Sequence, residues 1–376
     1  MKNFIIKTIP FFLLICSPLV LFSQIEVLIS DRADNSVNKY DLDGNFVEVF
    51  IEPNSGGISN PQDIVFLPND NVLMTGFGNN TIKEYDGTTG DYIGVFSTGY
   101  SLQGPTRMEL REDGYIYVLQ WSGNYKVVRF DMNGVFDSEY TDSGVFQSIG
   151  IDWDESGNLY VSSYGQGSNG LIKYFDSSGN EIGIFGDSSL LAGATNIWFQ
   201  PDGSGNLLAL DYNGNRLAQF DSSGTFLSFP ITGLATPEGY AYLPNGNLLI
   251  SERGADKISE FDADFNLIGR WDHPSGNLSG PNFIRIRDTN LSTSENIMEA
   301  PFIYPTIGEN FYFNTKNISA YDQVNIYDFH GKLIDSIDPN KDLVWNASFL
   351  PNGMYLMVAK SKSGKRRVQK IIVKKE

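Results

Sequence analysis

Short runs of alternating apolar and polar residues, separated by tight turns, make up most of the chain between residues 25 and 287. Valine, isoleucine, tyrosine and phenylalanine are frequent in these runs, which is typical of half-buried strands. The stretch "KYDLDGNFVEVF" at residues 39–50 predicts a strand, a turn and a second strand, and five similar stretches follow it. No amphipathic stretch is long enough to predict a helix. The pattern therefore predicts an all-β structure.

An aspartate opens each of the six turns: Asp41, Asp86, Asp131, Asp176, Asp221 and Asp262. The intervals between them are 45, 45, 45, 45 and 41 residues, and a period in this range is typical of four short strands and their connections. The aspartate caps the turn through its side chain, and a glycine such as Gly44 or Gly224 accepts a positive φ. In the sixth turn we expect Asn266 to take the place of the glycine.

The copies of the first strand are offset by one unit from the copies of the other three strands. The second, third and fourth strands occur six times, beginning with "EVLIS" at Glu26. The first strand also occurs six times, but its last copy, "PNFIRI" at Pro281, has no second strand after it. We expect this strand to complete the unit that the N-terminus begins, so that strand exchange closes a ring without open edges. The sequence predicts a six-bladed β-propeller over residues 24–287.

Two stretches of this repeat resemble a known motif. "GNLLALDYNGNRLAQFDSSG" (205–224) and "TPEGYAYLPNGNLLISERGADKISEFD" (236–262) are similar to NHL repeats. The resemblance extends through the six copies and implies a propeller. It implies little about function, because NHL propellers serve as scaffolds, as binders and occasionally as enzymes.

The N-terminus reads as an export signal. Lys2 and Lys7 precede the apolar run "IPFFLLICSPLVLF", so residues 1–23 are predicted to be a secretory signal peptide and the mature protein to have no transmembrane segment. Cys16 leaves a lipoprotein as an alternative, although Ile15 before it fits a lipobox poorly. Cys16 is the only cysteine. The mature chain therefore depends on its core rather than on disulfides.

Charge separates the C-terminal part from the rest. Residues 24–300 contain 14 Lys/Arg and 38 Asp/Glu, whereas residues 301–376 contain 11 and 7. The polar segment 288–300 reads as a linker, and the alternating runs of 301–376 predict a small β-sandwich. The acidic surplus of the propeller argues against nucleic acid as a partner.

The pieces "VNIYDFHGKLI", "LPNGMYLMVA" and "RRVQKIIVKK" resemble the C-terminal sorting domain of the type IX secretion system of Bacteroidota. The stretch "IYPTIGEN" departs from the Tyr-Pro-Asn-Pro that is usual in that family. The resemblance implies the type IX secretion machinery as a partner and a secreted or cell-surface location. It also implies that the domain is removed or exchanged for an anchor. An ordinary accessory sandwich is the alternative.

Aligning the six units on the second strand places one residue per blade at its end: Arg32, Phe77, Trp121, Tyr164, Tyr212 and Arg253. Four consecutive blades offer an aromatic ring and the two blades at the closure offer arginine. Such a set suits a glycan, peptide or protein ligand through stacking and bidentate hydrogen bonds. The alternative is that the rings pack between blades and the arginines pair with Asp31 and Glu252.

Catalytic residues are not identified, and the sequence favours a non-catalytic protein. His273 is the only histidine of 24–287, too few for a zinc lyase or a Ser-His-Asp hydrolase. Gluconolactonase-like propellers, which hold a divalent cation with Glu, Asn and Asp, are the alternative. Likeness to them would assign calcium or another divalent cation to Asp63, Asn196, Glu238 and Asn282.

Overall fold

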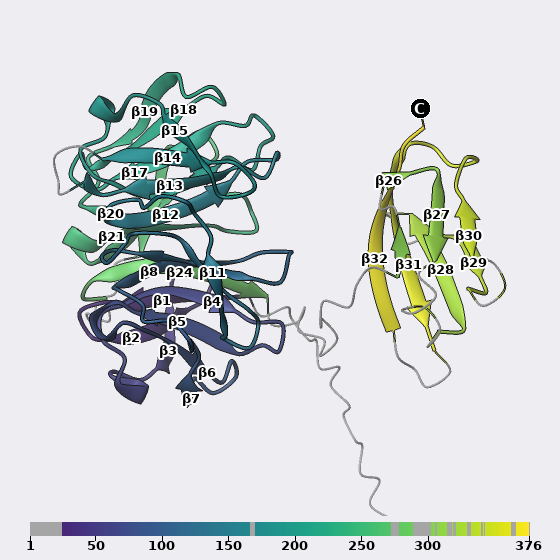
Figure 1. The fold of residues 1–376 in the computed structure, drawn as a ribbon, viewed down its shortest axis with the longest axis horizontal. Coiled ribbons are helices and arrows are strands. Elements are labelled where there is room, and N and C mark those ends of the chain that lie inside the picture. Colours follow the sequence, from purple (N-terminus) through teal and green to yellow (C-terminus); the bar gives the residue numbers. More distant parts are fainter. Residues whose placement is uncertain are drawn as a thin grey trace, which may run out of the picture.

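The computed structural model describes residues 25–165, 170–271 and 278–288. It also describes 302–375, with gaps at 305–306, 314–317, 319–320, 329–331, 340, 342 and 362–365. The predicted signal peptide with Cys16, the predicted linker beyond residue 288 and His273 lie outside the described residues. Figure 1 shows the order of the elements along the chain.

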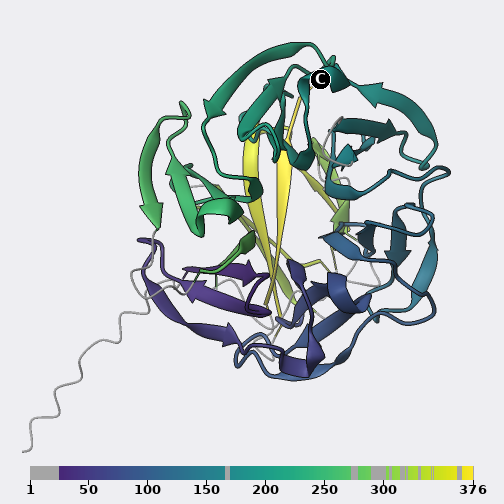
Figure 2. The same ribbon diagram turned by 90° about the vertical axis from the view of Figure 1, so that its left-hand side faces the viewer.

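Residues 25–288 form six four-stranded sheets around a central axis (Figure 2). We call these sheets blades. Blade 1 contains β24 (Pro281–Asp288), β1 (Ile25–Asp31), β2 (Ser36–Tyr40) and β3 (Phe46–Ile51). Blade 2 contains β4 (Pro61–Phe66), β5 (Val72–Gly76), β6 (Thr81–Tyr85) and β7 (Tyr92–Val95). Blade 3 contains β8 (Pro105–Leu110), β9 (Ile116–Gln120), β10 (Val128–Phe130) and β11 (Phe136–Glu139).

The remaining blades follow the same order. Blade 4 contains β12 (Ser148–Trp153), β13 (Leu159–Ser163), β14 (Leu171–Phe175) and β15 (Glu181–Phe185). Blade 5 contains β16 (Ala194–Phe199), β17 (Leu207–Asp211), β18 (Arg216–Phe220) and β19 (Phe226–Thr232). Blade 6 contains β20 (Pro237–Tyr242), β21 (Leu248–Glu252), β22 (Lys257–Phe261) and β23 (Leu267–Trp271). Short 3-10 turns lie at η1 (Ser55–Gly57), η2 (Phe77–Asn79), η4 (Ser188–Leu190) and η5 (Arg253–Ala255).

The first strand named for each blade is the innermost one, and these six strands contact one another in turn around the axis. Blade 1 is completed by strand exchange: β1 pairs antiparallel with β24, and Val27 lies opposite Ile286 and Ile29 opposite Ile284. The green β24 and the purple β1 lie side by side in Figure 1. The predicted six-bladed propeller and its closure are confirmed.

An apolar cluster fills each interface between neighbouring blades. At the closing interface, Val27 and Ile29 of blade 1 pack with Leu249 and Trp271 of blade 6, and all four are buried. Burial of such side chains is the main favourable term in folding. The interface that joins the two chain ends is therefore packed like the five others.

The repeated turns have the expected capping. The Asp41 carboxylate accepts hydrogen bonds from the backbone N–H groups of Asp43 at 3.0 Å and Asn45 at 2.8 Å, and Gly44 has a φ of 78°. The prediction for the sixth turn is wrong in one detail. Phe265, not Asn266, takes the positive φ, at 64°. Asn266 corresponds to Asn45, one residue later, and its amide donates to the capping Asp262 as that of Asn45 does to Asp41.

The C-terminal part contains two sheets with a common core, which confirms the small β-region predicted there. One sheet consists of β25 (Ile303–Tyr304), β27 (Asn310–Phe313) and β30 (Val344–Asn346). The other consists of β26 (Ile307–Gly308), β32 (Arg366–Val373), β31 (Gly353–Lys360), β28 (Gln323–Asp328) and β29 (Leu333–Ile337). Phe311 from the first sheet and Ile326 and Ile371 from the second belong to one buried cluster.

Candidate ligand-binding site

The six side chains predicted to bind a ligand all occupy one structural position, directly after the second strand of their blade. Arg32 follows β1, Phe77 follows β5, Trp121 follows β9, Tyr164 follows β13, Tyr212 follows β17 and Arg253 follows β21. The backbone fixes this position. The N–H of Trp121 donates to the carbonyl of Gly104, immediately before β8, and the N–H groups of Arg32, Phe77, Tyr164 and Tyr212 make equivalent bonds in their own blades.

The last residue of the second strand often clamps the loop that follows. The carboxylate of Asp31, which is fully buried, accepts from the N–H groups of Ala33 at 3.1 Å and Ser279 at 2.7 Å. Burial raises the pKa of Asp31, although these backbone hydrogen bonds oppose the shift. The Glu252 carboxylate accepts from the N–H of Ala235 at 2.6 Å. Both carboxylates thus hold loops in place, and neither is paired with the neighbouring arginine as the packing alternative expected.

We call the six side chains the arc; five of them, from Arg32 to Tyr212, form a continuous set of contacts, and Arg253 pairs with Glu238. The Arg32 guanidinium lies 5.2 Å from the ring centroid of Phe77. Ring centroids are then 6.0 Å apart for Phe77 and Trp121, 5.5 Å for Trp121 and Tyr164, and 5.8 Å for Tyr164 and Tyr212. All six residues are half-buried. The structure therefore brings together a row of residues that the sequence separates by whole repeats.

A cavity of about 220 Å³ lies within the arc. Its lining consists of Arg32, Trp121, Tyr164, Tyr212 and Arg253 from the arc, together with Ile149, Thr195 and Glu238. The last three are the second residues of β12, β16 and β20, so the innermost strands form the floor. Phe77 is outside this lining and contacts the two arc residues on either side of it.

Charged groups meet at the part of the cavity next to the ring closure. Arg253 lies 3.4 Å from the Glu238 carboxylate, which is almost fully buried. Arg32 donates to the neutral side chain of Asn60 at 3.4 Å. Burial lowers the pKa of Arg32; the positive charge of Arg253 acts in the same direction, and the negative charge of Glu238 opposes it. The cavity thus combines an apolar wall with two guanidinium groups and one carboxylate.

The four residues of the metal alternative are divided between this cavity and the channel. The amides of Asn282 and Gln62 are 2.7 Å apart, and the Asn282 amide nitrogen, when turned toward Glu238, lies 3.1 Å from its carboxylate. Asp63 instead forms an ion pair with Arg285 at 3.0 Å. Within the described residues, no group of three or more His, Cys, Asp or Glu side chains is placed to hold a metal ion.

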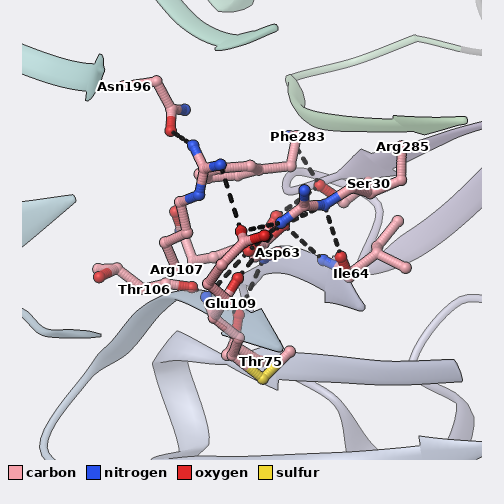
Figure 3. A network of polar contacts seen from close by, with 12 residues as sticks. Ser30, Asp63, Ile64, Thr75, Thr106, Arg107, Glu109, Asn196, Phe283 and Arg285 are labelled. Carbon is pink, nitrogen blue, oxygen red and sulfur yellow. Dashed lines mark hydrogen bonds and ion pairs between the residues drawn. The ribbon is translucent and has the colours of Figure 1, made fainter. Parts of the chain in front are cut away.

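A buried polar network occupies the channel farther along the innermost strands (Figure 3). Arg285 bridges the carboxylates of Asp63 and Glu109, at 3.0 and 3.5 Å. Arg107 donates to Asn196 and lies 3.5 Å from Glu109. Burial disfavours the charge of Arg107, but the nearby Tyr240, Glu109 and Asp63 outweigh it and raise its pKa. Asn196 and Asp63 therefore belong to a structural network within the ring.

Sequence reasoning missed a ring of buried hydroxyl groups that joins every blade to the next. Each hydroxyl donates to a backbone carbonyl of the following blade: Ser30 to Gln62, Thr75 to Thr106, Thr106 to Ser148, Ser162 to Thr195, Thr195 to Pro237, and Ser251 to Asn282. The sequence does contain a signal for this ring: in four blades, the next-to-last residue of the second strand is Ser or Thr. Blades 3 and 5 have Leu119 and Leu210 there, and the innermost strand supplies the hydroxyl instead.

Comparison with known proteins accounts for both parts of the chain. Residues 303–374 match the family model described as "Secretion system C-terminal sorting domain". This part is a type IX sorting domain, which implies recognition by that secretion machinery and indicates secretion or attachment to the cell surface. None of the helices among the described residues has the length and apolar character needed to cross a membrane.

The propeller resembles solved structures. A chain of the nidogen/laminin complex is 16% identical, with 70% of this chain and 98% of that chain covered and a TM-score of 0.57. A protein of unknown function from Bacteroides caccae is 14% identical, with 70% and 99% covered and a TM-score of 0.55. These matches show the fold alone. No curated protein is significantly similar in sequence. The chain is thus a six-bladed β-propeller with a type IX sorting domain.

Proposed function

We propose that the exported protein is a non-catalytic binding propeller that takes a glycan, peptide or protein ligand on the arc. The observation that carries this proposal is the continuous row of contacts from Arg32 to Tyr212 around one cavity. Aromatic rings and guanidinium groups on a rigid frame are the groups that most often anchor a ligand. Loops on a rigid frame are also where binding residues concentrate.

The place of the arc supports a binding role over a packing role. Aromatic side chains that pack between blades belong to the apolar clusters there, both fully buried ones such as Tyr85 and half-buried ones such as Tyr174, whereas none of the four arc rings is part of these clusters. The arc residues are only half-buried. They keep surface that stacking on a ligand would use, and the interfaces between blades are already filled by other side chains.

A divalent-metal lactonase has less support. Asp63 and Glu238 would have to give up their ion pairs with Arg285 and Arg253 to coordinate a cation. Asn196 would have to give up its hydrogen bond from Arg107. The two acidic groups also serve different places, one in the channel and one in the cavity. The polar groups of the alternative are therefore already used within the protein.

The test uses the exported protein on glycan and peptide arrays, followed by calorimetry. Trp121→Ala should abolish binding while the propeller still melts cooperatively, with a loss of stability from its two ring contacts. Tyr92→Ala, which removes an aromatic ring 39% exposed on the outer strand β7, is the matched control and should bind normally. Stoichiometric calcium, zinc or manganese binding that Glu238→Gln abolishes, together with lactone turnover, would overturn the proposal.

We also propose the domain division predicted from the sequence. Residues 1–23 would be the signal peptide, 24–287 the propeller, 288–300 the linker and 301–376 the sorting domain. Intact-mass measurement of the exported protein checks this division. The expected mass lacks residues 1–23 and 301–376, and a mature protein that keeps its basic C-terminus would contradict it.

A further inference from the structure

Four basic residues of the propeller have no carboxylate at ion-pair distance among the described residues: Arg32, Lys83, Arg111 and Arg270. Lys83 donates to the carbonyl of Gly56 and Arg111 lies over the ring of Trp153, whereas Arg32 lines the cavity. The other ten form ion pairs with carboxylates: Lys39, Arg107, Lys126, Arg129, Lys173, Arg216, Arg253, Lys257, Arg285 and Arg287. Arg32 is half-buried, and within the described residues its side chain has no carboxylate at ion-pair distance. A charge that is partly removed from water without a directly paired counter-charge is unfavourable, and Glu238, whose negative charge acts on Arg32, lies beyond ion-pair distance. Residues 24–300 contain 38 acidic and 14 basic residues, so an arginine that lines a cavity without a directly paired carboxylate points to an acidic ligand.

The charges around the cavity indicate which ligand. Arg32, Arg253 and Glu238 line it, and their sum is one positive charge. A single carboxylate would neutralise the excess and could form a bidentate pair with the guanidinium of Arg32. A phosphate would bring close to two negative charges next to the buried Glu238, which would repel it. The cavity therefore favours a ligand with one carboxylate at this point.

The size of the cavity and the length of the arc further restrict the class of ligand. About 220 Å³ is smaller than the roughly 300–1,000 Å³ of pockets that enclose a whole small ligand, so the cavity suits one ring. The aromatic part of the arc continues over four consecutive blades, from Phe77 to Tyr212. It offers stacking surfaces to several rings in succession. A peptide C-terminus supplies a carboxylate but no series of rings.

We propose that the arc binds an acidic polysaccharide, with the carboxylate of one hexuronic acid residue held by Arg32 in the cavity and the neighbouring sugar rings stacked along the aromatic side chains. Hydroxyl groups of the same residue can donate to the Glu238 carboxylate. This inference rests on the binding function proposed above and specifies its ligand.

The test compares ligands that differ only in charge. Oligogalacturonide and oligoguluronate tetrasaccharides are titrated into the exported protein by calorimetry, beside the fully methyl-esterified oligogalacturonide. At least one acid form should bind, and the ester should bind about tenfold or more weakly. Arg32→Gln should weaken binding of the acid roughly tenfold to a hundredfold, because a charge-assisted pair is lost. Arg32→Lys should give an intermediate loss of affinity, since lysine keeps the positive charge but cannot form the bidentate hydrogen bonds of a guanidinium group.

Arg270→Gln is the matched control, since it removes the same charge from the exposed end of the outer strand β23. It should leave binding unchanged. Equal binding of acid and ester, both abolished by Trp121→Ala, would overturn the hexuronate inference and leave the binding function intact. Binding of peptides with a free C-terminus, but of neither amidated peptides nor acidic sugars, would also overturn the hexuronate inference and leave the binding function intact. A protein that binds no glycan and no peptide would overturn both proposals.

Discussion

Blade 1, which is assembled from the two ends of the propeller, differs from the blades made of continuous chain in its charges. Arg287 on β24, Glu26 on β1, Lys39 on β2 and Glu48 on β3 form a ladder of alternating charge across all four strands, with distances of 2.5, 3.0 and 2.6 Å. Glu26 and Arg287 are 261 residues apart in the sequence. Their side chains are 9% and 12% exposed. These two groups and Lys39 are thus largely shielded from water, whereas Glu48 at the outer end of the ladder is 53% exposed.

Blade 4, made of continuous chain, has a simpler arrangement. Its pair Lys173–Glu181 joins only β14 and β15, and the side chains are 22% and 32% exposed. Exposed pairs of this kind contribute little. In blade 4 a short turn brings the strands together in register. In blade 1 no turn connects β24 to β1, so buried opposite charges help to specify a register in which a one-residue slip would separate them.

The largest effect should come from removing the strand that completes blade 1. Deletion of residues 281–288 exposes the edge of β1 and removes Ile284 from the closing cluster. We expect aggregation or loss of cooperative melting, measured by calorimetry and light scattering. Deletion of residues 302–376 is the control and should leave the melting of the propeller unchanged. A protein without 281–288 that melts as the intact protein does would show that closure is dispensable.

Removing one carboxylate from each blade tests the ladder directly. Glu26→Ala leaves the nearly buried Arg287 without its ion-pair partner and weakens the surroundings of Lys39, so it should lower the free energy of unfolding by about 3–5 kcal/mol. Glu181→Ala in blade 4 should cost at most about 1 kcal/mol. Urea denaturation measures both. Similar losses would mean that the ladder has no special role.

Loss of a bridging hydroxyl group should have the same effect at the closing interface, between blades 6 and 1, as at an interface between two blades that follow one another in the chain. Ser251 bridges blade 6 to blade 1 and Thr75 bridges blade 2 to blade 3, and each also accepts from a backbone N–H of its own blade. Ser251→Ala and Thr75→Val should each cost about 1–3 kcal/mol, because they leave buried backbone groups unpaired. A much larger loss for Ser251→Ala, again by urea denaturation, would show that the closing interface depends on its hydroxyl more than the others do.

The smallest effects should appear in the response to acid. Hydrogen bonds to the charged form lower the pKa of turn aspartates such as Asp221, where the Ser223 hydroxyl is the leading cause. The stability that they contribute is present above their usual pKa of 3.8 and is lost as the pH falls through the lowered value. Burial raises the pKa of Asp31 at the closure, so its contribution has the opposite sign and decreases as the pH rises.

Melting temperatures measured between pH 5 and pH 2.5 check these signs. Asp221→Asn should reduce the loss of stability below about pH 3.8, because its amide no longer titrates. Asp31→Asn should make that loss slightly steeper, because the native carboxyl partly offsets it. If Asp221→Asn leaves the acid profile of the protein unchanged, the turn aspartates do not account for its acid response.

The sequence predicted features that depend on one repeat at a time. The period of the turn aspartates indicated the blades, and the unmatched strand at Pro281 indicated the closure. The arc was found because its residues share one offset from a regular strand. Local similarity also caused the error at Asn266, since a phenylalanine with a positive φ is rare and was not expected at position 265.

Features that depend on several repeats at once were not predicted. Glu238 entered the sequence analysis only through the metal alternative, and its place in the cavity beside Arg253 was not foreseen. Arg285 pairs with Asp63, 222 residues away. The period of the repeat predicts the position of each residue on its own blade. It does not predict which extended side chains from different blades contact one another in the channel. Partner choice there is a three-dimensional property.

The course of β24 also determines how the propeller would be presented when held by its C-terminal side. This strand begins at Pro281, opposite Asp31 and next to the arc, and ends at Asp288, opposite Ile25. Its far end is fastened near the turn of Asp86, where Arg287 donates to the carbonyl of Gly87 at 2.7 Å. The chain therefore leaves the ring on the side opposite the arc. A tether attached beyond Asp288 would therefore orient the cavity away from the surface that holds the tether, toward the surrounding medium.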